Sequence, residues 1–336
     1  MRILTCTGYY GTGSSAITDL LSEFDNCYSL TEHEIRFIHD PEGVSDLEYN
    51  LVQNHNRHNS GHALKRFKNR VDFWAGNKII KKYEPYFNWK FKEISQEYIK
   101  DLTDFTYKGY WHQDVIDKGN LFYFRKRMLN KILQKTIWCK NTEKGLKELP
   151  NEITFCSHPS EEKFLRCTKD YTEKLFREAN IENKDNIVVD QLVPPSNINR
   201  YIRYFNNIRV FLVDRDPRDI YILEKYVWKG TIVPVDNIEL FCKWYKYTRS
   251  HRINENIDKE NVFFVQFEDM IYKYDETIAE IIKWLNWKEI NHNNKKKFFN
   301  PEISRKNTQV WKCFEEESAN IKYIEENLKE YIYEYN

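Results

Sequence analysis

The N-terminal segment constrains the fold of this chain more than any other stretch. Arg2–Thr7 is mainly apolar, Gly8–Ser15 contains three glycines, and Ala16–Leu21 has helical periodicity. This order predicts a strand, a tight loop and a helix. In such a unit, loop N–H groups and the positive end of the helix surround one anion. The segment therefore predicts a phosphate-binding loop; a tight strand-to-helix turn without a ligand is the alternative.

The spacing within this loop indicates how an anion would be held. Gly8 and Gly13 stand as far apart as the glycines of the phosphate-loop motif G-x-x-x-x-G-K-[ST], but Ser14 occupies the lysine position. We expect backbone groups and hydroxyls to bind the phosphate without the lysine that reaches a β/γ-phosphate. The candidate cofactor-binding residues are Gly8, Tyr10, Gly11, Thr12, Gly13, Ser14 and Ser15.

Composition excludes several classes of partner. The 336 residues carry 52 Lys and Arg against 51 Asp and Glu, a net charge of +1, so no overall field attracts nucleic acid or an anionic membrane. No run approaches the ~20 apolar residues that span a bilayer, and no signal-peptide pattern precedes the loop. Seven scattered cysteines without a C-x-x-C pair predict free thiols and a cytoplasmic protein, and no zinc spacing is visible.

The rest of the chain alternates between predicted strands and helices. Apolar runs at 27–30, 186–190, 208–214 and 261–265 are separated by helical patterns near 165–180, 197–206, 217–226, 236–256 and 275–286. Such alternation is typical of an α/β fold in which helices flank a parallel sheet. We predict one domain spanning 1–336, with 46–165 as a large, mostly helical insertion that is the candidate region for binding a substrate.

Polar motifs stand at the carboxyl ends of these predicted strands, where parallel sheets bind ligands. They are Gly8–Ser15, Glu32–Arg36, Asp190-Gln191, Asp214–Arg218 and Gln266–Asp269. The topology therefore predicts that these five segments meet along one edge of the sheet.

A second anion site is predicted where Arg215-Asp216-Pro217-Arg218-Asp219 follows a strand and opens a helix. Pro217 suits the first helical turn, and two arginines beside a helix N-terminus attract an anion. The alternative interpretation is a surface cluster of salt bridges with the neighbouring aspartates.

With these motifs the chain resembles the sulfotransferases that use 3′-phosphoadenosine 5′-phosphosulfate (PAPS). The matching segments come in the family's order: Gly8–Ser15, Arg215–Asp219, Val265–Met270 and Ser304–Lys312. The resemblance implies a P-loop-containing fold, PAPS as donor with PAP as product, and no metal. It also implies that Arg305, Lys306 and Asn307 close over the nucleotide. Among relatives the chain looks most like bacterial carbohydrate and capsular polysaccharide sulfotransferases, so the implied acceptor is a saccharide or polysaccharide.

Two positions depart from the family pattern. Gly11 stands where the family's loop usually carries Lys or Arg, and Leu223 stands where a serine often helps to bind the 3′-phosphate. Charge builds on the leaving oxygen during sulfuryl transfer and needs a cation or donor to stabilise it. We expect this cation to come from Arg36, Lys65, Arg66 or Lys306.

The catalytic base is expected after the second strand. Relatives use a His or a Glu there, and Glu34-Ile35-Arg36 resembles a Glu-x-Arg arrangement of that family. Strand alternation places Glu32, Glu34 and Arg36 on one face and His33 on the other. We therefore predict Glu34 as base, His33 as the next candidate and Arg36 as a positioning group; a solvated charged strand end is the alternative.

The acceptor is expected to contact Asp190 and the aromatic run Tyr110, Trp111 and His112. Aromatic rings can stack on sugars, although such clusters also serve as core, and Asp190 can instead cap a helix or act as a further base.

Two other functions remain open from the sequence. An ATP-dependent phosphotransferase or NTPase would use Gly8–Ser15 as its phosphate loop and Asp214 as its Mg²⁺ ligand, but it lacks the lysine. A catalytically degenerate nucleotide-binding protein would account for Gly11 and Leu223.

Overall fold

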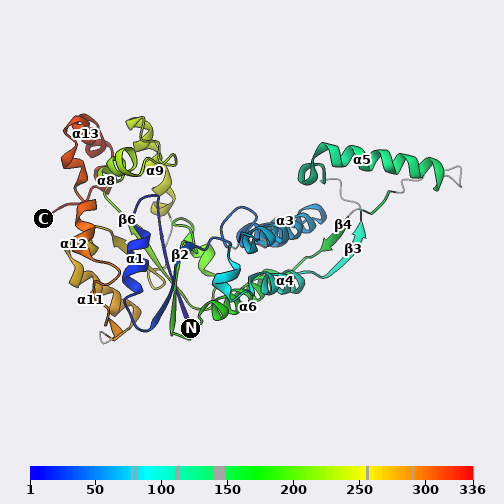
Figure 1. The fold of residues 1–336 in the computed structure, drawn as a ribbon, viewed down its shortest axis with the longest axis horizontal. Helices are drawn as coiled ribbons and strands as arrows, with labels where there is room; N and C mark the ends of the chain where they lie inside the picture. Colours follow the sequence, from blue (N-terminus) through cyan, green and yellow to red (C-terminus); the bar gives the residue numbers. More distant parts are fainter. Residues whose placement is uncertain are drawn as a thin grey trace.

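A five-stranded parallel sheet forms the centre of the protein (Figure 1). The computed structural model describes residues 1–76, 79–80, 82–109, 114–138, 148–150, 152–254, 257–288 and 291–335. The strand order is β2-β5-β1-β6-β7, and every pairing is parallel. The strands are β1 (Arg2–Gly8), β2 (Cys27–Glu34), β5 (Asn186–Asp190), β6 (Ile208–Asp214) and β7 (Val262–Gln266). The predicted α/β fold with a parallel sheet is confirmed, and the glycine-rich loop follows its central strand.

Alternate residues of β1 face opposite layers, as a buried strand requires. Ile3 packs into one core with α6 (Glu161–Ala179) and the helices before it. Leu4 packs into a second core with α1 (Ser14–Leu21) and α11 (Tyr274–Leu285). Helices therefore cover both faces, and ligands can approach only along the strand ends.

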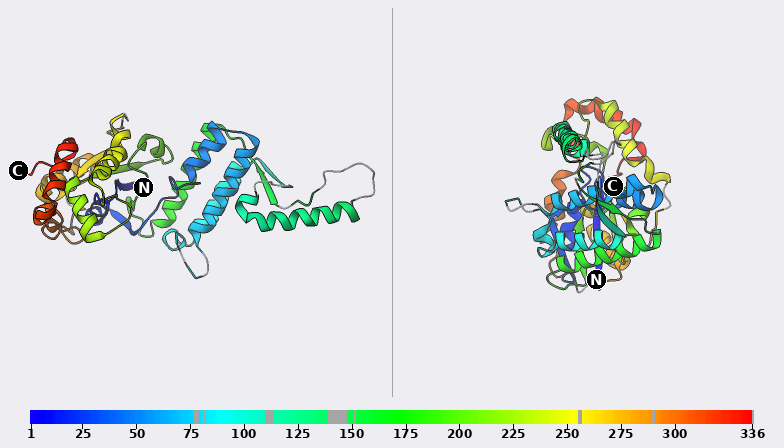
Figure 2. Two further views of the ribbon diagram at one scale, coloured as in Figure 1. Left: turned by 90° about the horizontal axis from the view of Figure 1, so that it is seen from above. Right: turned by 90° about the vertical axis from the view of Figure 1, so that its right-hand side faces the viewer.

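The insertion between β2 and β5 extends away from the sheet as an arm (Figures 1 and 2). Its inner part packs α3, α4 and α6 together, and α5 lies at its outer end. The helical elements are α2 (Val44–Glu48), a π-helical turn η1 (Tyr49–Gln53), α3 (Arg57–Ala75), a 3₁₀ turn η2 (Glu84–Phe87), α4 (Phe91–Leu102) and α5 (Asp114–Thr136). The arm also contains an antiparallel pair, β3 (Phe105–Gly109) with β4 (Glu152–Cys156), which the helical prediction missed. Both segments alternate β-branched or aromatic residues with polar ones, a strand pattern.

The remaining helices surround the C-terminal half of the sheet. Asp216 caps α8 by accepting a hydrogen bond from the Arg218 backbone N–H, and Pro217 occupies its first turn as predicted. α8, α9 and α13 share a third apolar core. The elements are α7 (Ile198–Ile202), α8 (Pro217–Ile222), π-helical η3 (Leu223–Trp228), α9 (Ile238–Asn254), α10 (Asp269–Tyr272), α12 (Pro301–Ser304), α13 (Ser318–Asn327) and the 3₁₀ turns η5 (Arg305–Asn307), η6 (Val310–Cys313), η7 (Glu315–Glu317) and η8 (Lys329–Tyr331).

Candidate active site

A cavity of about 900 Å³ opens at the carboxyl ends of the strands. Residues of the glycine-rich loop, the end of β2, the segment after β5, the start of the Arg215 motif and the C-terminal turn all line it. These segments are far apart in the sequence, and the structure brings them together at one edge of the sheet, as predicted. The volume suits a ligand of nucleotide size.

The glycine-rich loop forms one wall of this cavity. All seven predicted loop residues line it. Gly13 is the N-cap of α1 with φ 90°, and no side chain caps the helix. A Cβ on Gly13 would lie 2.6 Å from the Phe267 ring, so only glycine fits. The first N–H groups of α1 are thus left for a ligand, which is the arrangement that binds phosphate.

Gly11 explains the missing loop cation in steric terms. Its φ is 75°, and a Cβ there would lie 2.9 Å from the ring of Trp228. A lysine or arginine at this position would need both a left-handed backbone and a displaced tryptophan. The loop of this chain is therefore built around glycine at that point.

Arg215 lies at the cavity wall beside this loop and is 3% exposed. Its guanidinium donates to the carbonyl oxygen of Gly11 at 3.1 Å and to that of Asn307. It lies 4.4 Å from the centre of the Phe267 ring. Within the described part of the chain, its Nε has no hydrogen-bond partner and no carboxylate lies at ion-pair distance. Burial lowers the pKa of Arg215. The charges of Asp219, Glu268 and Asp216 act on the guanidinium from farther away, but none of these carboxylates pairs with it directly. A buried cation without a direct carboxylate partner is a site that favours an anionic ligand.

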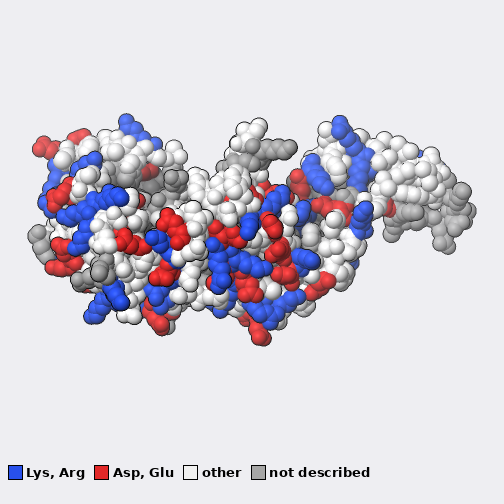
Figure 3. Space-filling view, turned by 60° about the horizontal axis from the view of Figure 1, so that its bottom comes forward, with Lys and Arg blue, Asp and Glu red and all other residues white. Residues whose placement is uncertain are grey.

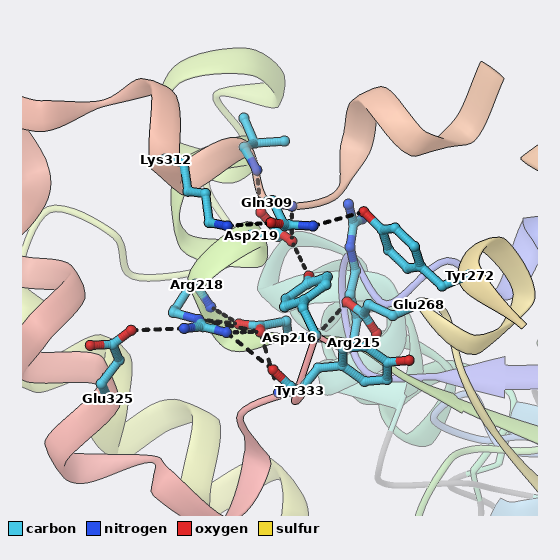
Figure 4. A network of polar contacts seen from close by, with 12 residues as sticks. Arg215, Asp216, Arg218, Asp219, Glu268, Tyr272, Gln309, Lys312, Glu325 and Tyr333 are labelled. Carbon is cyan, nitrogen blue, oxygen red and sulfur yellow. Dashed lines mark hydrogen bonds and ion pairs between the residues drawn. The ribbon is translucent and has the colours of Figure 1, made fainter. Parts of the chain in front are cut away.

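Arg218 has a different environment, although it belongs to the same motif (Figure 4). Its guanidinium donates to both carboxylate oxygens of Asp216, and its Nη1 lies 2.7 Å from Glu325. It also stacks on Trp311 at 4.4 Å. Arg218 does not line the cavity. Of the predicted pair of arginines, Arg215 therefore lines the cavity, whereas Arg218 forms ion pairs with carboxylates.

The end of β2 brings Glu34 and Arg36 to the cavity. Their side chains are 52% and 44% exposed and form an ion pair of 3.2 Å. β2 ends at Glu34, so Arg36 follows the strand instead of continuing its alternation. His33 does not line the cavity, and its ring lies 4.6 Å from that of Tyr86. Glu34 and His33 therefore have different surroundings, as the alternation predicted.

Asp190 stands next to Glu34 across the β2–β5 pairing. It is 8% exposed, and its Oδ1 has no hydrogen-bond partner among the described residues. Burial, and then the nearby charge of Glu34, raises the pKa of Asp190 to about 7. Its neighbour Gln191 lines the cavity and donates to the Ser14 hydroxyl at 3.0 Å. A carboxyl group with this pKa can exchange a proton near neutral pH.

The C-terminal turn contributes Ser304 and Asn307 to the cavity wall. Arg305 and Lys306 are exposed and lie outside the lining, and Arg305 stacks over Tyr272 at 5.3 Å. The turn is anchored on Asp219, which accepts hydrogen bonds from the backbone N–H groups of Gln309 and Val310 at 2.9 and 2.7 Å (Figure 4).

Of the proposed substitute cations, Arg36 lines the cavity. Lys65 and Arg66 on α3 pair with Asp117 at 3.0 and 2.6 Å, outside the lining. Lys306 also lies outside it. Tyr110, Trp111 and His112 fall outside the described residues.

Several cavity residues were missed by sequence reasoning. They are His39, Trp228, Tyr247 and Phe298. Burial lowers the pKa of His39, which favours its neutral form. None of these residues belongs to a motif, and folding alone brings them to the wall. Among the described residues of 46–165, none lines the cavity.

In the described ranges, no group of three or more His, Cys, Asp or Glu side chains is placed to hold a metal ion. The described helices include none whose length and apolar character would let it cross a bilayer.

Comparison with known proteins gives only distant likenesses. No protein-family model and no curated protein matches the chain. Among solved structures, the sulfotransferase domain of the Synechococcus PCC 7002 olefin synthase aligns with 11% identity and a TM-score of 0.40, over 89% of this chain and 76% of that one. Sulfotransferase STF9 from Mycobacterium avium aligns with 13% identity and a TM-score of 0.39, over 99% and 77%. Sulfotransferase STF1 from Mycobacterium tuberculosis H37Rv aligns with 11% identity and a TM-score of 0.33, over 92% and 76%. These neighbours are sulfotransferases, but at such values the functional argument rests on the site of this chain.

Proposed function

We propose that this protein is a PAPS-dependent sulfotransferase that transfers a sulfuryl group to a hydroxyl of a carbohydrate acceptor. The observation that carries the proposal is Arg215, a buried guanidinium at the cavity wall with no carboxylate at ion-pair distance among the described residues. Together with the glycine-rich loop it would offer two groups that bind anions in one cavity, the N–H groups at the start of α1 and the guanidinium of Arg215, which contacts the loop at the Gly11 carbonyl oxygen. A nucleotide with phosphate groups at two ends, such as PAPS, fits two positions better than a single triphosphate does.

The two positions would divide the nucleotide between them. The N–H groups at the start of α1 and the hydroxyls of Ser14 and Ser15 would hold the 5′-phosphosulfate. Arg215 would hold the 3′-phosphate, and Asn307, whose carbonyl oxygen it contacts, would close the site. When bound, PAPS supplies the activated sulfuryl group. Arg36, which lines the cavity, would supply the positive charge that Gly11 cannot.

The acceptor hydroxyl needs a base, and two neighbouring carboxylates are available. Glu34 lies on the cavity wall, so we propose that it takes the proton. Asp190, its partner on the neighbouring strand, does not line the cavity but is the alternative, because its pKa of about 7 suits proton exchange near neutral pH. Arg36 would position the acceptor or the transferring group through its ion pair with Glu34.

The carbohydrate acceptor is proposed from the family resemblance. The exposed rings of Trp228 and Tyr247 at the cavity wall are 47% and 70% exposed and offer surfaces on which a sugar can stack. The role of 46–165 as acceptor-binding region stays a prediction.

An NTPase is disfavoured by the surroundings of Asp214, which would be its Mg²⁺ ligand. The carboxylate accepts a hydrogen bond from Arg249 at 2.8 Å, and the Arg249 side chain is fully buried. A carboxylate engaged in this way is a poor ligand for a divalent cation.

The compartment is proposed from the cysteines. Cys6, Cys27, Cys156, Cys167, Cys242 and Cys313 are free thiols. Free thiols persist in a reducing environment, which is consistent with the cytoplasm.

The proposal is tested by ligand binding with matched arginine variants. We expect PAP to raise the thermal midpoint without a metal, since a ligand at 100 times its dissociation constant adds about 2.7 kcal/mol. Arg215→Ala should weaken PAP binding by roughly 1.5–3 kcal/mol but affect 5′-AMP less, because that nucleotide lacks the 3′-phosphate. Arg218→Ala is the matched control and should weaken PAP far less. Tight Mg²⁺-dependent ATP binding without a response to PAP would overturn the proposal.

A further inference from the structure

The outer end of the arm carries a helix whose exposed face is both apolar and basic. Gly119, with φ 79°, interrupts α5, so that the rest of the helix runs from residue 120 to 136. By the rise of an α-helix this segment is about 25 Å long. Figure 1 places it at the opposite end of the molecule from the sheet.

One face of this helix exposes four large apolar side chains. Leu121, Phe124, Met128 and Ile132 are 62%, 61%, 45% and 54% exposed. Their spacing of three, four and four residues places them in one stripe. The opposite face is occupied, because the buried Asn130 accepts a hydrogen bond from the Leu149 backbone N–H at 3.1 Å. The stripe therefore lies on the side of α5 away from Asn130; Tyr123 and Leu129, outside the stripe, are also exposed, at 36% and 46%.

The helical segment that carries this stripe is basic, although Glu148 lies beside it and Lys118 pairs with Glu152 at 3.2 Å. Residues 118–138 contain six Lys and Arg and no Asp or Glu. At 100° per residue, Arg125 and Lys131 flank the stripe on its two sides. On the face in Figure 3, acidic and basic side chains mix over the body of the molecule; on the arm, basic side chains gather beside a few acidic ones, and the outermost described part is mainly uncharged. The net charge of +1 for the whole chain thus conceals a strongly basic end.

The base of the helix is held to the arm by ion pairs. Asp117 pairs with Lys65 at 3.0 Å and with Arg66 at 2.6 Å, both on α3. These ion pairs hold the part of α5 before Gly119 against α3.

We propose that α5 binds the surface of a membrane that contains anionic lipids, lying in the plane of the interface. An apolar stripe flanked by cations has the form of an interfacial helix: the apolar side chains enter the lipid, and Lys and Arg contact the headgroups. Two copies of α5 facing each other would bring cations against cations. A nucleic acid would satisfy the cations but leave the aliphatic side chains without an apolar partner. This inference does not depend on the proposed enzymatic function, since the cavity lies at the other end of the molecule.

The test is sedimentation of the full chain with vesicles of phosphatidylcholine alone and of equal parts phosphatidylcholine and phosphatidylserine. We expect binding to the anionic vesicles, weakened by added salt, and little binding to the neutral ones. Lys131→Gln with Lys135→Gln should lower the partition coefficient about 25-fold, at about fivefold per cation. Phe124→Ser with Ile132→Ser should lower it by about tenfold or more.

Matched controls separate the stripe from general surface effects. Ile181→Ser changes an apolar residue that is 65% exposed near the sheet, and Lys322→Gln changes an exposed lysine on α13; neither should alter binding. Unchanged thermal midpoints would establish that the α5 variants fold. No vesicle binding, equal binding to both vesicle types, or equal loss in the controls would overturn the proposal. Self-association without vesicles that disappears in the Phe124/Ile132 variant would also overturn it, in favour of a second copy.

Discussion

Replacing Asp190 by Asn should make the protein more stable at alkaline pH while leaving its stability at acidic pH nearly unchanged. Burial and the charge of Glu34 raise the pKa of Asp190 from an ordinary value of 3.8 to about 7. The native state therefore holds a proton that the unfolded chain has already lost. Below about pH 4, Asp190 does not lower the free energy of unfolding. Its destabilising effect grows as the pH rises and is complete above about pH 7.

The size of this cost follows from the shift. About three pKa units at 1.36 kcal/mol each give about 4 kcal/mol of lost stability above pH 7. At pH 5 the Asp190 carboxyl is already ionised in the unfolded chain, so part of the destabilisation is present at that pH. About 3 kcal/mol more should appear between pH 5 and pH 8. Asn cannot ionise and should not show this loss.

Urea unfolding of wild type and Asp190→Asn at pH 5 and pH 8 measures the difference directly. The advantage of the variant should grow by about 3 kcal/mol between the two pH values. Asp185→Asn, at an exposed aspartate directly before β5, controls for loss of a carboxylate near the other end of this strand. An advantage that stays the same at both pH values would refute the raised pKa and, with it, Asp190 as the alternative base.

Two further predictions concern catalysis and closure of the site. Glu34→Gln should keep PAP affinity and lower turnover about 10²–10⁴-fold, measured as PAP release with a saccharide panel. His33→Gln should have little effect because His33 lies outside the cavity. The reverse pattern would assign the base to His33, and no effect of either substitution would leave Asp190 as the base. PAP should slow amide exchange across Ser304–Lys312, because Asn307 already contacts Arg215, with α13 as an unaffected reference; equal exchange with and without PAP would contradict a closing role.

The sequence by itself determined the elements that depend on local patterns. A strand, a glycine-rich loop and a helix were predicted in Arg2–Leu21, and β1 and α1 occupy this segment. The apolar runs predicted the other four strands of the parallel sheet, and the rule that ligands bind at strand ends predicted where the motifs meet. Such predictions succeed because neighbouring residues supply most of the information.

Tertiary structure alone decided which side chains face the cavity. Arg215 and Arg218 are three residues apart in one motif. Arg218 is engaged by the neighbouring Asp216 and by Glu325, which is more than a hundred positions away, whereas Arg215 lies at the cavity wall. Likewise, the proximity of Glu34 to Asp190 depends on β2 pairing with β5, whose residues are more than a hundred positions away. The exposed stripe of α5 is also a tertiary property, because an apolar helical pattern looks the same whether another element covers it or not. Partners distant in sequence set burial and charge neutralisation, and these two quantities decide which residues remain available to a ligand.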